Sequence, residues 1–427
     1  MTSTSAPAGR SSSLTARRRP GTSAGRPDPL PLATLVGGAA LTVAVAADGS
    51  PAGRAGRAVL FAALGLAAYR AMRAGRPRAR TALALVLGTA GTAAGAMLGP
   101  RFLATGEATL RAAAATVLLA ASLVLLVGGS WAAVRAGHGW RRLLAVPVAL
   151  ALVLVIAFPV GIAVMATNAP RPALGDATPA DHGLAYEDVT FPAADGVTLS
   201  AWYVPSRNGA ALVVLHGASS TRSNVLGPGV ALAEHGYGVL MVDARGHGGS
   251  DGRAMELGWY GDEDVTGAVG YLSTREDVDP GRIGAVGFSM GGEEALGALA
   301  AEGRLRAVVG EGVTNRTYAD RAWLPAGPNG WVQRGMDRLA FSFTDLLTDA
   351  SPPLPLRVSA GLAAPRPVLL VAGSGEEDAA DLIRRASPST VAVWEAHTGH
   401  TDAFADRRED WEAHVFGFLD DALAAAG

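Results

Sequence analysis

Long apolar runs fill the first part of the chain, and shorter ones follow. Five runs of mainly Ala, Leu, Val and Gly cover residues 30–47, 58–69, 81–98, 112–134 and 143–167. A helix needs about 20 apolar residues to cross a bilayer, and four of the runs reach or approach that length. The second run is short and spans only if Arg57 and Arg70 extend their side chains to the interfaces; the alternative is an interfacial helix. We expect about five transmembrane helices over residues 30–167.

The arginines between these runs predict an orientation. Five arginines precede the first run, and the four connections that follow contain two, five, two and three. This alternation fits the positive-inside rule for five spans with a cytoplasmic N-terminus. The region after residue 167 is then extracytoplasmic. Residues 1–29 are rich in Ser, Pro, Gly and Arg, which predicts a disordered basic tail.

From residue 168 onward, short apolar runs alternate with helical patterns. Residues 186–205 alternate apolar and polar positions and turn at Ala194-Asp195-Gly196, which predicts a hairpin. Continuous apolar runs typical of strands buried on both faces cover residues 211–217, 238–243, 282–288, 305–312, 366–373 and 390–396. Helical patterns lie near 224–235 and 262–274, directly after Ser289, and near 378–385 and 409–425. The alternation predicts one α/β domain with a mostly parallel sheet over residues 168–427.

One strand-to-helix junction carries chemistry. The run at 282–288 ends in Gly-Phe-Ser-Met-Gly, and a helical pattern follows at once. A tight turn of this kind needs small residues at Gly287 and Gly291, and its strain exposes the Ser289 hydroxyl. The helix start supplies a free N–H at Met290 that can face a developing oxyanion. The alternative is a glycine-rich loop with a spectator serine.

Several stretches together resemble a known family. They are "LHGASS", "DARGHGGSDG", "DVDPGRIGAVGFSMGG", "RPVLLVAGSGEE" and "HTGHTDAF", in that order. On these, residues 184–425 resemble the α/β-hydrolase family, in particular its dienelactone-hydrolase-like and acyl-peptidase-like serine hydrolases. The resemblance implies a doubly wound, mostly parallel sheet with a cap insertion, and a catalytic triad in the order Ser, acid, His. The apolar N-terminal region has no part in it.

The resemblance also selects the partners of the serine. His400 follows the last predicted strand, where the family has its base, with His397 as the competitor and a solvated loop histidine otherwise. Glu376 stands at the usual position of the acid, where the family commonly has Asp. The other candidates for the acid are Glu377, Asp378 and Glu311.

The remaining expectations concern the rest of the site. By resemblance, the second oxyanion donor is the N–H of Ala218, and His216 has a structural role. The glycines and Asp251 of residues 245–252 are expected to hold a turn near the site. Residues 313–360 are expected to form the cap. Its apolar residues, which face either a substrate or each other, are Trp323, Leu324, Trp331, Leu339, Phe341 and Phe343.

The amino-acid composition excludes several kinds of covalent chemistry. The chain has no cysteine, and its 36 basic residues are all Arg. Thiolate nucleophiles, disulfides and Schiff bases are therefore excluded. No His-x₃-His pair or P-loop spacing is present, so we expect neither a metal nor a cofactor.

We therefore predict a membrane-anchored serine hydrolase that cleaves an ester, thioester or amide through an acyl-enzyme. Its partners would be a small acyl or peptide-like substrate and the lipid bilayer, with no nucleic acid. The alternative is a catalytically weak hydrolase-fold domain used for binding or sensing, because the acid position departs from the common Asp.

Overall fold

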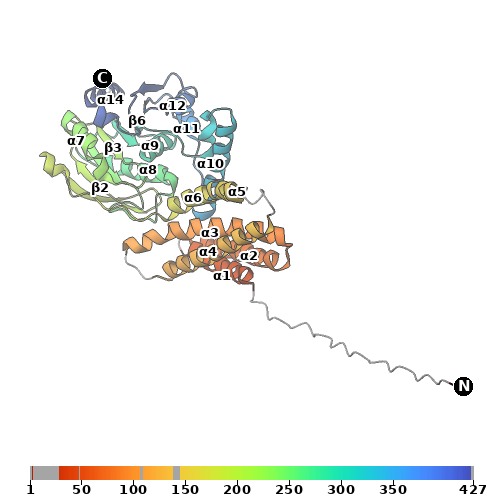
Figure 1. The fold of residues 1–427 in the computed structure, drawn as a ribbon. Helices are drawn as coiled ribbons and strands as arrows, with labels where there is room; N and C mark the ends of the chain where they lie inside the picture. Colours follow the sequence, from red (N-terminus) through yellow and green to blue (C-terminus); the bar gives the residue numbers. More distant parts are fainter. Residues whose placement is uncertain (1, 3–27, 48, 106–108, 138–144, 425–427) are drawn as a thin grey trace.

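A computed structural model describes residues 2, 28–47, 49–105, 109–137 and 145–424. A layer of apolar helices lies against a larger α/β region in Figure 1. The predicted basic tail, residues 1–29, lies almost entirely outside the described residues.

The helical layer follows the apolar runs of the sequence. Its elements are α1 (Pro29–Val45), α2 (Pro51–Ala74), α3 (Pro77–Thr105), α4 (Leu110–Ala136), α5 (Ala145–Leu152), the π-helical turn η2 (Val153–Ala157) and α6 (Phe158–Asn168). Proline is favoured in a first helical turn because its missing N–H would have no partner there, and α1, α2 and α3 each begin with one. The side chains of Asp28 and Ser50 cap the first two helices by accepting N–H bonds.

Three of these helices are long and apolar enough to cross a membrane, judged by length and composition of the described residues. They are Pro51–Ala74, Pro77–Gly99 and Leu110–Ala136. The second apolar run, which looked too short, lies inside a helix of 24 residues because Gly, Ala and Arg extend the helix at both ends. Pro29–Val45 and Val155–Asn168 are shorter apolar helices. The number of spans stays a prediction.

The α/β region is built on one eight-stranded sheet with the order β1-β2-β4-β3-β5-β6-β7-β8. The strands are β1 (Glu187–Pro192), β2 (Thr198–Val204), β3 (Ala211–Leu215), β4 (Gly238–Asp243), β5 (Ile283–Phe288), β6 (Leu305–Glu311), β7 (Val368–Ala372) and β8 (Val391–Glu395). β2 is antiparallel to both of its neighbours, and the other pairs are parallel. The hairpin and the parallel strands agree with the sequence pattern.

Helices cover both faces of this sheet. One face packs against α8 (Gly261–Leu272), α9 (Met290–Ala301), α11 (Leu356–Ala363) and α12 (Glu377–Arg384). The other packs against α7 (Leu226–His235) and α14 (Arg408–Ala422). Short helical turns connect these elements: η3 (Pro179–His182), η4 (Arg222–Val225), η5 (Glu256–Gly258) and α13 (Ala403–Asp406). Every residue of β3, β4, β5 and β7 is buried, as their continuous apolar runs require.

The segment between β6 and β7 forms the cap. It contains η6 (Tyr318–Trp323), the long α10 (Pro328–Leu347) and α11. Two of the apolar cap residues named from the sequence, Trp331 and Leu339, are exposed, whereas Leu324 is buried within the fold. Phe341 and Phe343 line two different cavities, one at Ser289 and one beside α1, α2 and α3.

The cap also joins the two parts of the molecule. α6 packs against both α3 and α10, so it lies between α3 and the α/β region (Figure 1). Arg57, which would extend toward a membrane interface if the short second run spanned, is buried and forms an ion pair of 2.7 Å with Asp349, just after α10. Its guanidinium also donates to the carbonyl of Val45, at the end of α1. Arg57 therefore ties the α1–α2 connection to the cap.

Candidate active site

Ser289 occupies the turn between β5 and α9. Its backbone angles are φ 52° and ψ −120°, a strained conformation for a residue with a side chain. A Cβ on Gly287 would lie 2.3 Å from the carbonyl oxygen of Gly291, and one on Gly291 would lie 2.7 Å from that of His216. Neither position can therefore carry a side chain, as the motif predicted. The Ser289 N–H donates to the Glu311 carbonyl on β6, which fixes the turn against the sheet.

The structure brings together the three residues predicted for catalysis. The Ser289 hydroxyl lies 2.8 Å from Nε2 of His400. Nδ1 of the same ring lies 2.5 Å from Oε1 of Glu376. Oε2 of Glu376 accepts the Gly373 N–H at 2.8 Å, so the carboxylate is held on both oxygens. This chain of contacts suits proton transfer from the hydroxyl to the ring, with the carboxylate fixing the ring tautomer.

The other acid candidates point elsewhere. Glu377 accepts the Gly375 N–H at 2.7 Å and belongs to the first turn of α12, as does Asp378. Glu311 is buried and accepts from the Ala403 N–H and the Trp411 indole. It thus anchors the segment that follows His400 rather than the ring itself.

The loop that carries His400 is fixed by backbone bonds to β7. Ala396 donates to Ala372, and Ser374 donates to Thr398. His397 is exposed, in agreement with the solvated loop histidine considered for it. The loop therefore presents one imidazole to Ser289 and leaves the other in solvent.

The charge around His400 favours its protonated form. The hydrogen bond to Glu376 is the main cause of a raised pKa, and the negative charges of Glu376, Glu293 and Glu311 add to it. Partial burial of the ring opposes this effect. A raised pKa makes the imidazole a stronger base toward the serine proton.

The residues predicted as oxyanion donors flank the serine. Met290 is the first residue of α9, and Ala218 lies in the loop after β3; both line a cavity with Ser289. A Cβ on Gly217 would lie 3.3 Å from Cβ of Ser289, so the β3 loop passes close to the nucleophile.

His216 has a structural environment, as the sequence indicated. It is 1% exposed, and its Nε2 accepts the Ala244 N–H at 3.0 Å. Burial lowers the pKa of His216 to about 3, so the ring is neutral. It links the loops that follow β3 and β4.

The turn at residues 245–252 is held in part as expected: Gly246, Gly248 and Gly252 have positive φ, which favours glycine, but the carboxylate that fixes the turn is not that of Asp251. The carboxylate of Asp243, at the end of β4, accepts N–H bonds from Arg222 and Gly249, and Ser250 donates its hydroxyl to the Asp243 carbonyl. Asp251, which we had named, contributes its backbone, with its N–H donating to Thr198. The side chain of Asp251 is exposed.

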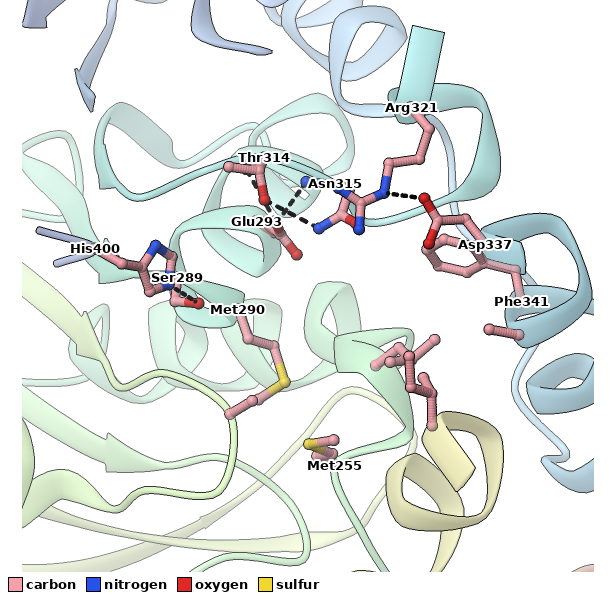
Figure 2. A pocket seen from close by; sticks show the side chains of 14 residues that line it. Met255, Ser289, Met290, Glu293, Thr314, Asn315, Arg321, Asp337, Phe341 and His400 are labelled. Carbon is pink, nitrogen blue, oxygen red and sulfur yellow. Dashed lines mark hydrogen bonds and ion pairs between the residues drawn. The ribbon is translucent and has the colours of Figure 1, made fainter. Parts of the chain in front are cut away.

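Two cavities meet at the serine and the histidine. The active-site cavity, of about 280 Å³, lies under the cap, and Figure 2 shows its lining side chains. One wall is apolar, with Met255, Met290 and Phe341, and also Ile162 from α6. A second cavity of about 480 Å³, lined in part by Asn224 and Phe404, opens on the other side of Ser289 and His400. A substrate can therefore extend in two directions from the reacting carbonyl.

The opposite wall of the active-site cavity is polar, and sequence reasoning missed it. It contains Glu293, Thr314 and Asn315, and an ion pair of 3.0 Å between Arg321 and Asp337 (Figure 2). Glu293 accepts the N–H groups of Thr314 and Asn315, and burial raises its pKa to about 7. Glu293 lies in the first turn of α9, only four residues after Ser289, and this closeness to the nucleophile is the signal that could have found it.

Comparisons with known proteins identify related sequences. A family model described as X-Pro dipeptidyl-peptidase (S15 family) matches residues 151–414. The uncharacterized protein Rv2307c of Mycobacterium tuberculosis is 37% identical over 131 residues, which cover 30% of this chain and 44% of that protein. The match thus spans less than half the length of the mycobacterial relative.

Two further relatives differ in coverage. The uncharacterized protein YfhR of Salmonella typhimurium is 27% identical over 261 residues, covering 56% of this chain and 83% of that protein. Among solved structures, the Pyrococcus furiosus esterase Pf2001 is 23% identical with a TM-score of 0.49, covering 60% of this chain and 98% of that chain.

The fold class predicted from the sequence is confirmed. It is an α/β-hydrolase fold with a mostly parallel sheet and a cap insertion, preceded by an all-helical region with three apolar candidate spans. The dienelactone-hydrolase branch stays a prediction.

Proposed function

The chain belongs to the X-Pro dipeptidyl-peptidase (S15) family, and from this premise we propose that it is a membrane-anchored serine hydrolase. The observation that carries the proposal is the pair of contacts on one imidazole, 2.8 Å to the Ser289 hydroxyl and 2.5 Å to the Glu376 carboxylate. The substrate is an ester, thioester or amide.

The proposed reaction starts with the serine. His400 Nε2 takes the Ser289 proton as the oxygen attacks the substrate carbonyl, and Glu376 stabilises the imidazolium through Nδ1–H. The N–H groups of Met290 and Ala218 bind the oxyanion of the tetrahedral intermediate. His400 then returns the proton to the leaving group, and water cleaves the acyl-enzyme by the same route.

The two cavities offer separate spaces for two parts of a substrate. Ser289 and His400 line both, so the acyl part and the leaving group have separate spaces. The active-site cavity is apolar on one wall and carries Glu293 and the Arg321–Asp337 pair on the other. Such a site suits an acyl group that also carries polar groups, which includes a short peptide.

We also propose that the hydrolase lies on the extracytoplasmic side of the membrane. Its cap contacts the α1–α2 connection through Arg57 and Asp349. With five spans and a cytoplasmic N-terminus, as the arginine distribution predicts, this connection is outside. Protease digestion of spheroplasts tests the side: the α/β region should be cut in intact spheroplasts, and its protection would refute this orientation.

Turnover of chromogenic substrates tests the activity. The full-length protein in nanodiscs is assayed with p-nitrophenyl esters of increasing acyl length and with X-Pro-p-nitroanilides, after the family's name. His400→Ala should abolish turnover, and His397→Ala, three residues away and exposed, should keep it. Turnover insensitive to His400→Ala, or absent from the wild type on every substrate, favours the binding or sensing domain instead.

A further inference from the structure

A third cavity, separate from the two at Ser289, lies where the helical layer meets the cap. This junction cavity has a volume of about 240 Å³ and is lined by α1, α2, α3, α6 and the end of α10, together with Arg111 and Arg253. Its walls are mainly apolar, with Leu41, Phe61 and Leu64 among them. An engineered apolar cavity of about 150 Å³ is large enough to bind benzene, so this one is large enough for an alkyl chain.

The junction cavity also has a polar part. Asn168, the last residue of α6, is 1% exposed and lines the cavity. Both polar atoms of its side chain lack a hydrogen-bond partner among the residues that the structure describes. A buried amide with no partner is costly, and native proteins rarely keep one without a reason. Asn168 is therefore an unexplained donor and acceptor directed at a cavity.

The polar residues of the cavity lie at helix ends. Arg111 is in the first turn of α4, and Asn168 ends α6. Arg253 forms an ion pair with Glu256 and also donates from Nη2 to the carbonyl of Leu347, the last residue of α10. The apolar residues come both from inner turns, such as Leu64 of α2, and from helix ends, such as Val45 of α1 and Leu347 of α10. The cavity is thus amphipathic, because arginine and amide groups line it together with hydrocarbon side chains.

From these features we propose that the junction cavity binds a medium-chain fatty-acid anion. The alkyl chain lies among the apolar side chains of α1, α2 and α3. The carboxylate lies near Asn168 and the two arginines, because an amide N–H and guanidinium groups both donate to a carboxylate.

Binding there bears on the active site, on the premise that the proposed hydrolase function holds. α6 lines the active-site cavity with Ile162 and the junction cavity with Val164. α10 does the same with Phe341 and Leu346. A ligand in the junction cavity would therefore contact two helices that also line the substrate site.

Photo-labelling tests the site without requiring turnover. The full-length Ser289→Ala protein in phosphatidylcholine nanodiscs is irradiated with a medium-chain fatty acid that carries a diazirine, and the labelled peptides are mapped. We expect labels on α6 and on the C-terminal part of α10, displaced by decanoate and not by decanol. Because this variant lacks the serine, a negative result here counts against the cavity and leaves the hydrolase proposal intact.

Three variants sharpen the result. Ala163→Leu fills the cavity and Asn168→Leu removes its unpartnered amide, and each should reduce labelling about tenfold or more. Ala62→Leu adds the same side chain at an exposed position of α2 outside the cavity and should leave labelling unchanged. If both cavity variants label like the wild type, the proposal is wrong. It is equally wrong if a diazirine phosphatidylcholine labels the same peptides and decanoate does not displace it.

Discussion

Glutamine in place of Glu376 keeps the size of the side chain but reverses a hydrogen bond. Oε2 accepts the Gly373 N–H and Oε1 faces Nδ1 of His400. In Glu376→Gln the amide oxygen stays on Gly373, because the Gly373 N–H donates and an amide NH₂ group cannot accept it. The NH₂ group then points at Nδ1, which must become an acceptor, and the ring proton moves to Nε2.

This change of tautomer removes the base. Nε2, 2.8 Å from the Ser289 hydroxyl, then carries a proton and cannot accept another. The same substitution at the acid of a serine protease triad lowers kcat by about 10⁴. That factor corresponds to about 5 kcal/mol of transition-state stabilisation. We expect a loss of this size for Glu376→Gln.

The assay compares kcat/KM for p-nitrophenyl butyrate between matched variants. Glu377→Gln is the control, because its carboxylate contacts Gly375 and not the imidazole. It should stay within about twofold of the wild type, since surface changes of this kind have small effects. If Glu376→Gln kept more than about a tenth of the activity while folded, the proton-relay geometry argued here would be wrong.

Three further predictions concern pH and the junction. The neighbouring carboxylates raise the pKa of His400, and its ring must be neutral to act as the base. The acid limb of the pH profile of kcat/KM should therefore have its midpoint above about pH 6.5, and this midpoint should move to lower pH in Glu293→Gln. A midpoint below that value would contradict the electrostatics. Burial raises the pKa of Glu293 from 4.5 to about 7, so the folded protein holds a proton that the unfolded chain releases, and wild-type stability should fall as pH rises through this window. Glu293→Gln keeps the acceptor for the two N–H bonds but cannot titrate. In thermal unfolding, its free energy of unfolding at pH 8 should gain about 3 kcal/mol over that of the wild type, which loses this amount between acid pH and pH 8. Equal pH dependence of the two proteins would refute this. Arg57→Ala removes the ion-pair partner of Asp349, whose side chain is partly exposed. The free energy of unfolding should fall by about 1–2 kcal/mol, measured by a thermal melt. An unchanged melt would show that the ion pair does not hold the cap to the helical layer.

Much of the α/β region was readable from the sequence. A strand buried on both faces must be apolar throughout, and runs such as residues 211–217 and 366–373 therefore mark β3 and β7 directly. The turn at Ser289 was readable because two backbones cross there at a distance that only glycine permits. The order of the family motifs then indicated which histidine and which carboxylate meet it.

Other features depend on contacts between distant segments and have no local pattern. Glu376, Glu377 and Asp378 are consecutive acids, and the backbone at Gly373 decides which one faces the imidazole. Ile162 looked like one more apolar residue of a membrane run, yet it lines the active-site cavity because α6 packs on the cap. Asp243 was hidden for a similar reason, since its partners come from loops before and after it in the chain.

Labelling with a fluorophosphonate tests the central claim most directly. Membranes that contain the full-length protein are treated with the probe, and the modified peptide is sequenced. We predict one adduct on Ser289, absent from Ser289→Ala and weakened in Glu376→Gln. An unlabelled wild type, or an adduct of equal yield in Ser289→Ala, would contradict the account.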